Sequence, residues 1–195
     1  GDRLVLDNVS LQIQGGDWLW LTGPSGAGKT TLVHSLIGAV TLSSGEVTVD
    51  GYNITKFNRL ALQEYRRKLG IVFQDYKLLP RKTVYENVSF AMEVCGYTER
   101  QNAERVPEVL EKVGLSQARH QFPYQLSGGE KQRCAIARAL IHEPRLIIAD
   151  EPTGNLDPKT AEDIVALFHK LHIEGATVIF ATHNLTLLDR LKKRQ

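Results

Sequence analysis

The sequence predicts an α/β fold with a mostly parallel core sheet, an antiparallel β portion and a helical subdomain. Two continuous apolar runs, Leu146–Ala149 and Thr177–Ala181, are typical of central parallel strands that are covered on both faces. Segments with helical spacing precede and follow these runs, and such alternation is typical of an α/β core. Near the amino terminus, Val9–Ile13 alternates apolar and polar residues, which predicts a half-exposed strand of the antiparallel portion.

The elements of the first part of the chain lead into a strand–loop–helix unit. After the Val9–Ile13 strand, the apolar run Trp18–Leu21 predicts a strand that ends in a glycine-rich loop. Lys29–Ile37 has helical spacing, and Gly45–Gly51 is a further strand bounded by turn residues. We therefore expect the antiparallel portion to be attached to this strand, loop and helix.

The middle of the chain is predicted to be mainly helical. Ile71–Phe73 is a short strand of the buried type, and residues 83–113 follow a helical pattern that is broken at Gly96. A further helix starts at Ser127 and must end by Pro144.

The last part returns to the core. Asp157 is an N-cap residue followed by proline, so a helix is expected from there to about His172, and a last helix follows the second apolar strand. We interpret the chain as a single domain. Residues 1–82 and 141–195 form the core with its antiparallel portion, and residues 83–140 form, approximately, the helical subdomain.

Composition excludes several classes of protein. The 24 basic and 22 acidic residues nearly cancel to a net charge of +2, which gives no footprint for nucleic acid. No apolar run approaches the ~20 residues that span a bilayer, so we expect a cytosolic chain whose membrane role requires a partner. Cys95 and Cys134 lie far apart without metal-type spacing and are expected to be free thiols.

A phosphate-binding loop follows the Trp18–Leu21 strand. Gly23–Thr30 fits the pattern G-x-x-x-x-G-K-[ST], and its position between a strand and a helix is that of a P-loop NTPase. Lys29 would reach the β- and γ-phosphates, and the Thr30 hydroxyl would bind Mg²⁺. The candidate nucleotide-binding residues are Gly23, Pro24, Ser25, Gly26, Ala27, Gly28, Lys29, Thr30 and Thr31.

Polar residues follow three of the predicted strands. Asp150 and Glu151 end the Leu146–Ala149 strand, His183 comes just after the next one, and Gln74 ends an earlier one. Because the carboxyl ends of parallel strands meet at one edge, these side chains are expected near the phosphate loop. Asp150 would orient the metal and Glu151 would polarise the attacking water.

A second glycine-rich helix start lies at Ser127. The sequence predicts that Ser127 and Glu130 form a capping box. The capping box does not explain Gly128 and Gly129, which need another reason because glycine is unfavourable in a helix. Bare backbone N–H groups at a helix start favour phosphate, yet the first loop already binds the phosphates of one nucleotide. Two chains packed head to tail would use both starts, each closing the site of the other.

These residues resemble those of an ABC-type ATPase (ATP-binding cassette) over essentially the whole chain. The motifs, in chain order, are the Walker A loop Gly23–Thr30, the Q-loop Phe73–Gln74, the signature Leu126–Glu130, the Walker B strand Leu146–Asp150 with Glu151, the D-loop Gly154–Asp157 and the switch histidine His183. Six motifs in the family's order make the resemblance specific.

The resemblance implies a head-to-tail homodimer with ATP and Mg²⁺ at its interface. The residues that would bind ATP in trans are Ser127, Gly128, Gly129, Glu130 and Asp157, and the residues implied for the metal are Thr30, Gln74 and Asp150. Glu151 is then the general base, and His183 contacts the γ-phosphate. Gln74 joins the catalytic group as the link between Mg²⁺ and a membrane partner, and Asp157 acts in communication across the dimer.

The segment Asp150–Asp157 resembles the branch of lipoprotein-release, macrolide-export and cell-division ATPases. The phosphate loop and Phe73–Pro80 are most similar to the cell-division members, which regulate peptidoglycan hydrolysis with an integral membrane partner. The resemblance implies an ATPase subunit that is cytoplasmic and peripheral on the inner face of the membrane. Two alternatives stay open: a subunit of a lipoprotein-release or macrolide-export transporter, and a nucleotide-dependent scaffold with little hydrolysis.

The chain departs from the usual family pattern in two places. Members usually stack an upstream aromatic residue on adenine, whereas Gly1–Leu4 contains none. Members also usually add two more strands after the switch-histidine helix.

The docking groove for the membrane partner is expected near the Q-loop. For about half of the candidate residues, the alternative is that they belong to the core. These candidates are Tyr76, Leu78, Leu79, Val84 and Tyr85.

Overall fold

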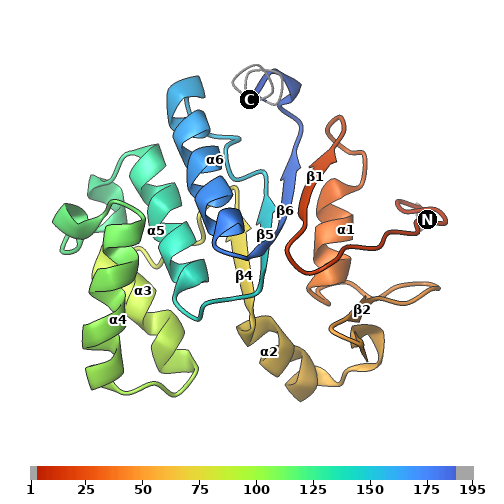
Figure 1. The fold of residues 1–195 in the computed structure, drawn as a ribbon, viewed down its shortest axis with the longest axis horizontal. Coiled ribbons are helices and arrows are strands. Elements are labelled where there is room, and N and C mark those ends of the chain that lie inside the picture. Colours follow the sequence, from red (N-terminus) through yellow and green to blue (C-terminus); the bar gives the residue numbers. More distant parts are fainter. Residues whose placement is uncertain (1–3, 188–195) are drawn as a thin grey trace.

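The computed structural model describes residues 4–187, which contain a four-stranded parallel sheet with the order β1–β6–β5–β4 (Figure 1). The strands are β1 (Trp18–Thr22), β4 (Leu69–Phe73), β5 (Leu146–Asp150) and β6 (Thr177–Thr182). In the strand register, Phe73 pairs with Asp150, and Asp150 pairs with Ala181. The parallel core is therefore confirmed, and the residues that follow these strands meet at one edge of the sheet.

Helices cover both faces of the sheet, which explains the continuous apolar strands. One face carries α1 (Lys29–Leu36) and α2 (Arg59–Arg67), and the other carries α5 (Gly128–Leu140) and α6 (Pro158–Ile173) (Figure 1). Side chains of β6 alternate between two apolar clusters: Val178 and Phe180 belong to the α5–α6 side, and Ile179 belongs to the α1 side. Each central strand is thus buried on both sides.

The predicted helical region contains two helices that pack outside α5. They are α3 (Val84–Val94) and α4 (Glu99–Lys112), separated by a turn at Gly96, and both begin at a threonine capping box. Apolar residues of α3, α4 and α5 form one cluster with residues of β4 and β5. The division into a core and a helical subdomain of residues 83–140 stays a prediction.

The amino-terminal strand prediction is wrong. Residues 9–13 form no strand, and the side chains of Val9 and Leu11 are 54% and 49% exposed. The antiparallel pair consists of β2 (Thr48–Val49) and β3 (Tyr52–Asn53), which bond only to each other. An alternating pattern forms a strand only where a partner offers backbone hydrogen bonds, and this short pair offers none to residues 9–13.

The structure also adds elements. Helix α2 has no counterpart in the predicted elements, although Asn58 caps it by accepting a hydrogen bond from the Ala61 N–H. Residues 185–187 are helical, and the rest of the predicted last helix lies outside the described residues. Short 3-10 turns cover Ile54–Lys56, Ser116–Ala118 and Pro123–Gln125.

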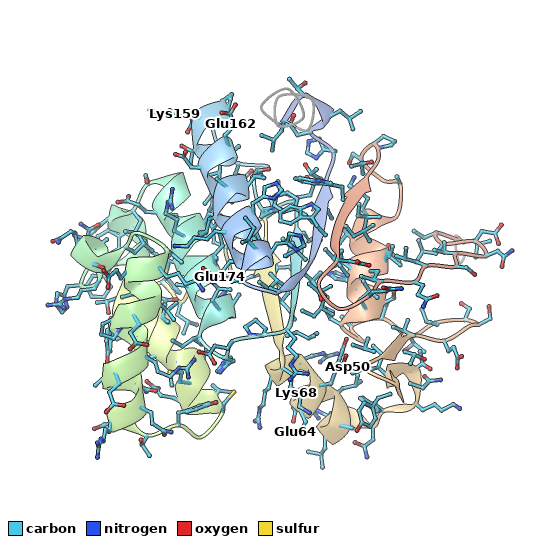
Figure 2. All side chains as sticks on the ribbon, viewed as in Figure 1. Asp50, Glu64, Lys68, Lys159, Glu162 and Glu174 are labelled. Carbon is cyan, nitrogen blue, oxygen red and sulfur yellow. The ribbon has the colours of Figure 1, made fainter. Side chains whose placement is uncertain are left out.

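Charged side chains project from the outer elements. Figure 2 labels Asp50, Glu64, Lys68, Lys159, Glu162 and Glu174 at such positions. Across residues 4–187, no helix combines the length and the apolar character that crossing a membrane requires. Cys95 and Cys134 are both free, as predicted.

Candidate active site

The phosphate loop connects β1 to α1. Lys29 is only 8% exposed, and its Nζ donates to the backbone oxygens of Gly23 at 2.9 Å and Pro24 at 3.1 Å. Gly28 caps α1 with φ of +91°, a conformation that side chains rarely adopt. Residues 25–27 lie between Pro24 and Gly28 and are exposed, and the Ala27 N–H donates to the Pro24 backbone oxygen at 3.2 Å. A glycine-rich turn of this kind is where backbone N–H groups can bind an anion.

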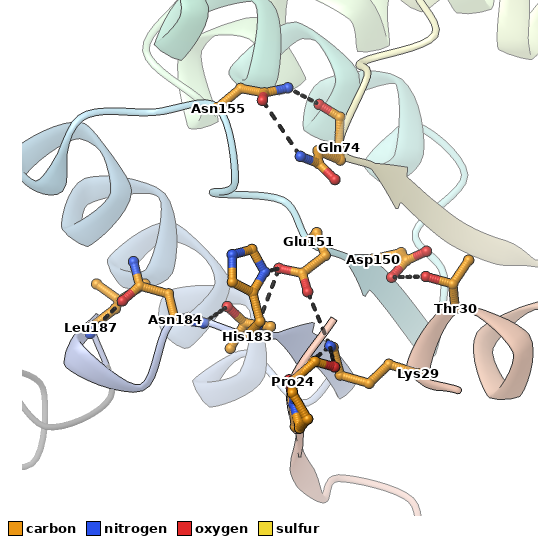
Figure 3. A network of polar contacts seen from close by, with 12 residues as sticks. Pro24, Lys29, Thr30, Gln74, Asp150, Glu151, Asn155, His183, Asn184 and Leu187 are labelled. Carbon is orange, nitrogen blue, oxygen red and sulfur yellow. Dashed lines mark hydrogen bonds and ion pairs between the residues drawn. The ribbon is translucent and has the colours of Figure 1, made fainter. Parts of the chain in front are cut away.

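Glu151 lies between Lys29 and His183, as Figure 3 shows. Its Oε1 is 3.4 Å from Lys29 Nζ, and its Oε2 is 2.9 Å from His183 Nδ1. The same Oε2 accepts the backbone N–H of His183 at 3.2 Å. The Glu151 side chain is 12% exposed and that of His183 is 51% exposed, so the carboxylate is shielded while the imidazole is accessible to a ligand.

The topology explains why these residues meet. Glu151 follows β5 directly, with φ of +50°, and its N–H donates to Ala181 at the end of β6. His183 follows β6, and Lys29 starts α1 after the loop from β1. The sheet edge thus joins three residues that are far apart in the sequence.

Asp150 and Thr30 form the oxygen-rich part of the site. Thr30 Oγ1 donates to Asp150 Oδ1 at 3.3 Å (Figure 3). Thr31 follows in the first turn of α1. Burial raises the pKa of Asp150, and the neighbouring Glu151 carboxylate adds to the increase. A buried carboxylate beside a hydroxyl supplies the hard oxygen ligands that Mg²⁺ prefers, so these residues fit the predicted metal.

Replacing Asp150 with asparagine is expected to stabilise the fold and abolish Mg²⁺-dependent hydrolysis. Because the pKa is raised in the folded state, ionised Asp150 lowers stability once the pH exceeds the unfolded value of 3.8. Asparagine removes this charge and keeps an oxygen for Thr30. Thermal unfolding should show a higher Tm at pH 7, and the gain should vanish at acidic pH. An unchanged Tm at pH 7 would contradict this account.

Gln74 comes to the same sheet edge but contacts the D-loop. Its Nε2 donates to Asn155 Oδ1 at 3.4 Å, and Asn155 Nδ2 donates to the Gln74 backbone oxygen at 3.3 Å (Figure 3). A Cβ at Gly154 would lie 2.7 Å from Gln74 Nε2, so a side chain there would displace the Gln74 amide from this position. In this arrangement Gln74 points toward Asn155, whereas Thr30 and Asp150 pair with each other. Its predicted role at the metal stays a prediction.

The signature residues lie at the start of α5. The predicted capping box is present: Ser127 Oγ and Ser127 N both donate to Glu130 Oε2, at 2.7 and 2.8 Å. These hydrogen bonds lower the pKa of Glu130. Asp157 caps α6 by accepting the Lys159 and Thr160 N–H groups, and its hydrogen bonds from Thr160 lower its pKa.

The two signature glycines also meet a packing requirement that the sequence does not reveal. A Cβ at Gly129 would lie 2.6 Å from Thr160 Cγ2, and one at Gly128 would lie 3.3 Å from Leu156 Cδ2. Glycine therefore allows α5 to approach α6 and the D-loop closely. The role of these glycines toward a second chain stays a prediction.

The sequence does not indicate two polar contacts at and after Gln74. Asn155 belongs to a predicted motif but has no predicted role of its own, and it bonds to Gln74. Arg138 belongs to no predicted site, and it bonds to the backbone oxygens of Tyr76 and Lys77. Among the docking candidates, Val84 is fully buried in the core. Leu78 and Tyr85 are partly buried against that core.

Comparisons with known proteins agree with this geometry. The family model described as ABC transporter matches residues 6–154. The chain is 47% identical over 190 residues to the cell division ATP-binding protein FtsE of Streptococcus pneumoniae, covering 97% of this chain and 83% of the relative. The FtsE proteins of Mycobacterium tuberculosis and Escherichia coli K12 are 45% and 41% identical, over 98% and 100% of this chain and 84% and 87% of theirs.

Solved structures show the same architecture. The dimeric structure of MJ0796, a bacterial ABC transporter cassette, matches with a TM-score of 0.85 and 38% identity, covering 94% of this chain and 82% of that one. A dimeric post-hydrolysis state of the same cassette, bound to ADP and Pi, matches with a TM-score of 0.85 and 37% identity over the same shares.

Proposed function

This chain belongs to the ABC transporter family and is an ATPase, and on that premise we propose that it is the ATP-binding and ATP-hydrolysing subunit of a membrane ABC complex. In the finer proposal it acts with an FtsX-type integral membrane protein in bacterial cell division, where the complex regulates peptidoglycan hydrolysis. The meeting of Lys29, Glu151 and His183 at one sheet edge carries the catalytic part. The relatives named as cell division proteins support the cellular part.

Hydrolysis follows from the position of the Glu151 carboxylate. Its Oε2 is fixed by the His183 N–H, whereas Oε1 faces Lys29. When Lys29 turns from the carbonyls of its own loop to the β- and γ-phosphates, Oε1 is released and accepts a proton from the attacking water. The exposed imidazole of His183 contacts the γ-phosphate.

Thr30 and Asp150, together with Gln74, would hold Mg²⁺. The metal supplies positive charge that neutralises the phosphate oxygens in the transition state. Thr30 and Asp150 are already in contact, and Gln74 would join them from the end of β4 if it left Asn155. The exchange of Gln74 between Asn155 and the metal would connect nucleotide binding to the D-loop.

A head-to-tail homodimer would complete each site. Ser127, Gly128, Gly129 and Glu130 start α5, where backbone N–H groups and the helix dipole favour the phosphates of an ATP bound to another copy. Asp157 would lie at the same interface, because its D-loop packs beside Gly128. The dimeric form of the similar cassette supports this assembly.

A groove of about 510 Å³ beside the start of α3 is the proposed docking site for the membrane partner. It is lined by Thr83, Tyr85, Glu86, Arg119, His120 and Phe122. Tyr85 was a candidate from the sequence, and the stack of Phe122 with Tyr124 extends the apolar surface. Aromatic residues beside charged ones are typical of the buried centre and rim of an interface.

The test coexpresses the chain with an FtsX-type protein from the same genome and measures how much of that protein copurifies. Tyr85→Glu is expected to lower this amount by at least ~10-fold, because the new carboxylate would be buried in the interface without a partner. ATP affinity, measured with a fluorescent analogue, should not change. The matched control is Tyr52→Glu on β3, where the side chain is 67% exposed and does not line the groove. Full retention by Tyr85→Glu would exclude this groove, and no retention by the wild-type chain would contradict the FtsX-type partner.

A further inference from the structure

The chain makes an unfavourable bend directly after Gln74. Tyr76 and Lys77 have φ of +61° and +49°, and neither is glycine. The Lys77 N–H donates to the Asp75 backbone oxygen at 2.6 Å, which closes the bend. Two successive left-handed residues with bulky side chains are strained, so contacts elsewhere in the fold must hold them.

Arg138 on α5 makes those contacts. Its Nη2 donates to the Tyr76 backbone oxygen at 2.9 Å, and its Nη1 donates to the Lys77 backbone oxygen at 2.5 Å. Arg138 is partly buried, and this burial lowers the pKa of its guanidinium. The two fixed donors of one planar guanidinium suit two successive carbonyls in a way that the ammonium of lysine would not.

Tyr76 also reaches the other end of the same helix. A Cβ built at Gly128 would lie 3.4 Å from the Tyr76 hydroxyl, so this side chain lies against the start of α5. Tyr76 therefore contacts α5 at two points, through its carbonyl at Arg138 and through its hydroxyl near the signature glycines.

The chain beyond the bend is held by a second helix. Asn87 on α3 is fully buried and accepts the Leu79 N–H at 2.7 Å. Its Nδ2 donates to the backbone oxygens of Leu79 and Lys82, at 3.1 and 2.9 Å. The segment after Gln74 is thus attached to the helical part of the molecule at both of its ends.

We propose that Arg138 is a positioning residue that fixes the Tyr76–Lys77 bend onto α5. Gln74 precedes this bend, and the signature residues 127–129 start α5. Arg138 therefore keeps these two parts of one chain in a fixed relative position. This inference rests on the proposed head-to-tail dimer, in which those signature residues serve the neighbouring chain's ATP. Movement of Gln74 toward its own nucleotide therefore moves the helix that contacts the second nucleotide.

The test compares Arg138→Met with Arg138→Met/Lys77→Gly. The single variant should raise amide hydrogen exchange across residues 75–79 at least ~10-fold, because the bend is no longer held. It should lower kcat for ATP at least ~10-fold while KM stays within about twofold, because only the trans arrangement is disturbed. Glycine adopts positive φ without strain, so the double variant should recover at least ~3-fold in both readouts.

Further variants distinguish the loss of a held bend from a general loss of stability. Lys77→Gly alone should keep wild-type kcat. Arg138→Lys keeps the charge and one donor and should therefore show intermediate amide exchange. The lysine variant also replaces Arg138→Met in the test if the methionine variant does not fold. A merely structural role predicts that glycine destabilises the protein further and rescues nothing, and that outcome overturns the proposal, as does wild-type exchange in Arg138→Met. If the wild-type chain does not hydrolyse ATP, the proposed function fails, while the exchange measurement still decides whether Arg138 holds the bend.

Discussion

Replacing Glu151 with glutamine is expected to lower the ATP turnover rate at least ~100-fold, because a general base contributes about 10²–10⁴-fold. Glutamine keeps the size of the side chain and can still accept the His183 N–H, but it cannot take a proton from water. ATP affinity should stay within about twofold or improve. The reason is that the substitution removes the ion pair that holds Lys29 at 3.4 Å from Glu151 and so frees this lysine for phosphate.

Steady-state turnover and equilibrium binding of a fluorescent ATP analogue measure the two effects separately. Glu111→Gln makes the same chemical change on the exposed side of α4 and should leave both values unaltered. Equal turnover in wild type and Glu151→Gln would exclude the catalytic role of this carboxylate. Very low turnover in both would favour the alternative of a nucleotide-dependent scaffold.

The positions of the catalytic candidates were predictable because they depend on topology. Two buried apolar runs imply neighbouring parallel strands, and such strands end at one edge, so Glu151 and His183 were expected to lie near each other. The structure places His183 Nδ1 2.9 Å from Glu151 Oε2. The chemical role of Glu151 is inferred from its position beside Asp150, and that of His183 is implied by the family resemblance. Both stay predictions until they are measured.

Features that depend on a distant partner were not predictable. Val9–Ile13 has the pattern of a strand, but the pattern cannot say whether another strand lies beside it. Arg138 contacts Tyr76 across 62 positions of sequence, and neither residue belongs to a spacing that indicates the contact. A hydrogen bond of this kind forms only when the packing of helices places the backbone oxygens of a bend within reach of the side chain.

The start of α5 contains one feature that the sequence predicts and one contact that it does not. The sequence correctly predicted the Ser127–Glu130 capping box, and it left the two glycines to a phosphate role alone. In the structure a Cβ at Gly129 would meet Thr160 Cγ2 at 2.6 Å. Any side chain at Gly129 therefore strains the contact between α5 and α6, and loss of activity in a single variant would not separate packing from nucleotide binding.

A second substitution separates the two requirements. Thr160→Ser removes the methyl group that a Cβ at Gly129 would meet, and serine keeps the hydroxyl and N–H groups that bond to Asp157. In this background we compare Gly129→Asp with Gly129→Asn, which has nearly the same shape and no charge. The aspartate variant should lose ATP hydrolysis and ATP-driven dimerisation at least ~100-fold, because a carboxylate near the γ-phosphate of the neighbouring chain's ATP is strongly repelled.

The asparagine variant should lose less than ~10-fold, and ATP binding by the monomer should stay within about twofold in both variants. Dimerisation is best measured by sedimentation with Mg²⁺-ATP in chains that also carry Glu151→Gln, so that ATP is not consumed. Equal losses in the aspartate and asparagine variants would mean that the glycine serves only the packing of α5 on α6. If the aspartate variant retained hydrolysis, the proposed contact between the signature and the neighbouring chain's ATP would be excluded, because a negative charge beside a triphosphate is strongly repelled.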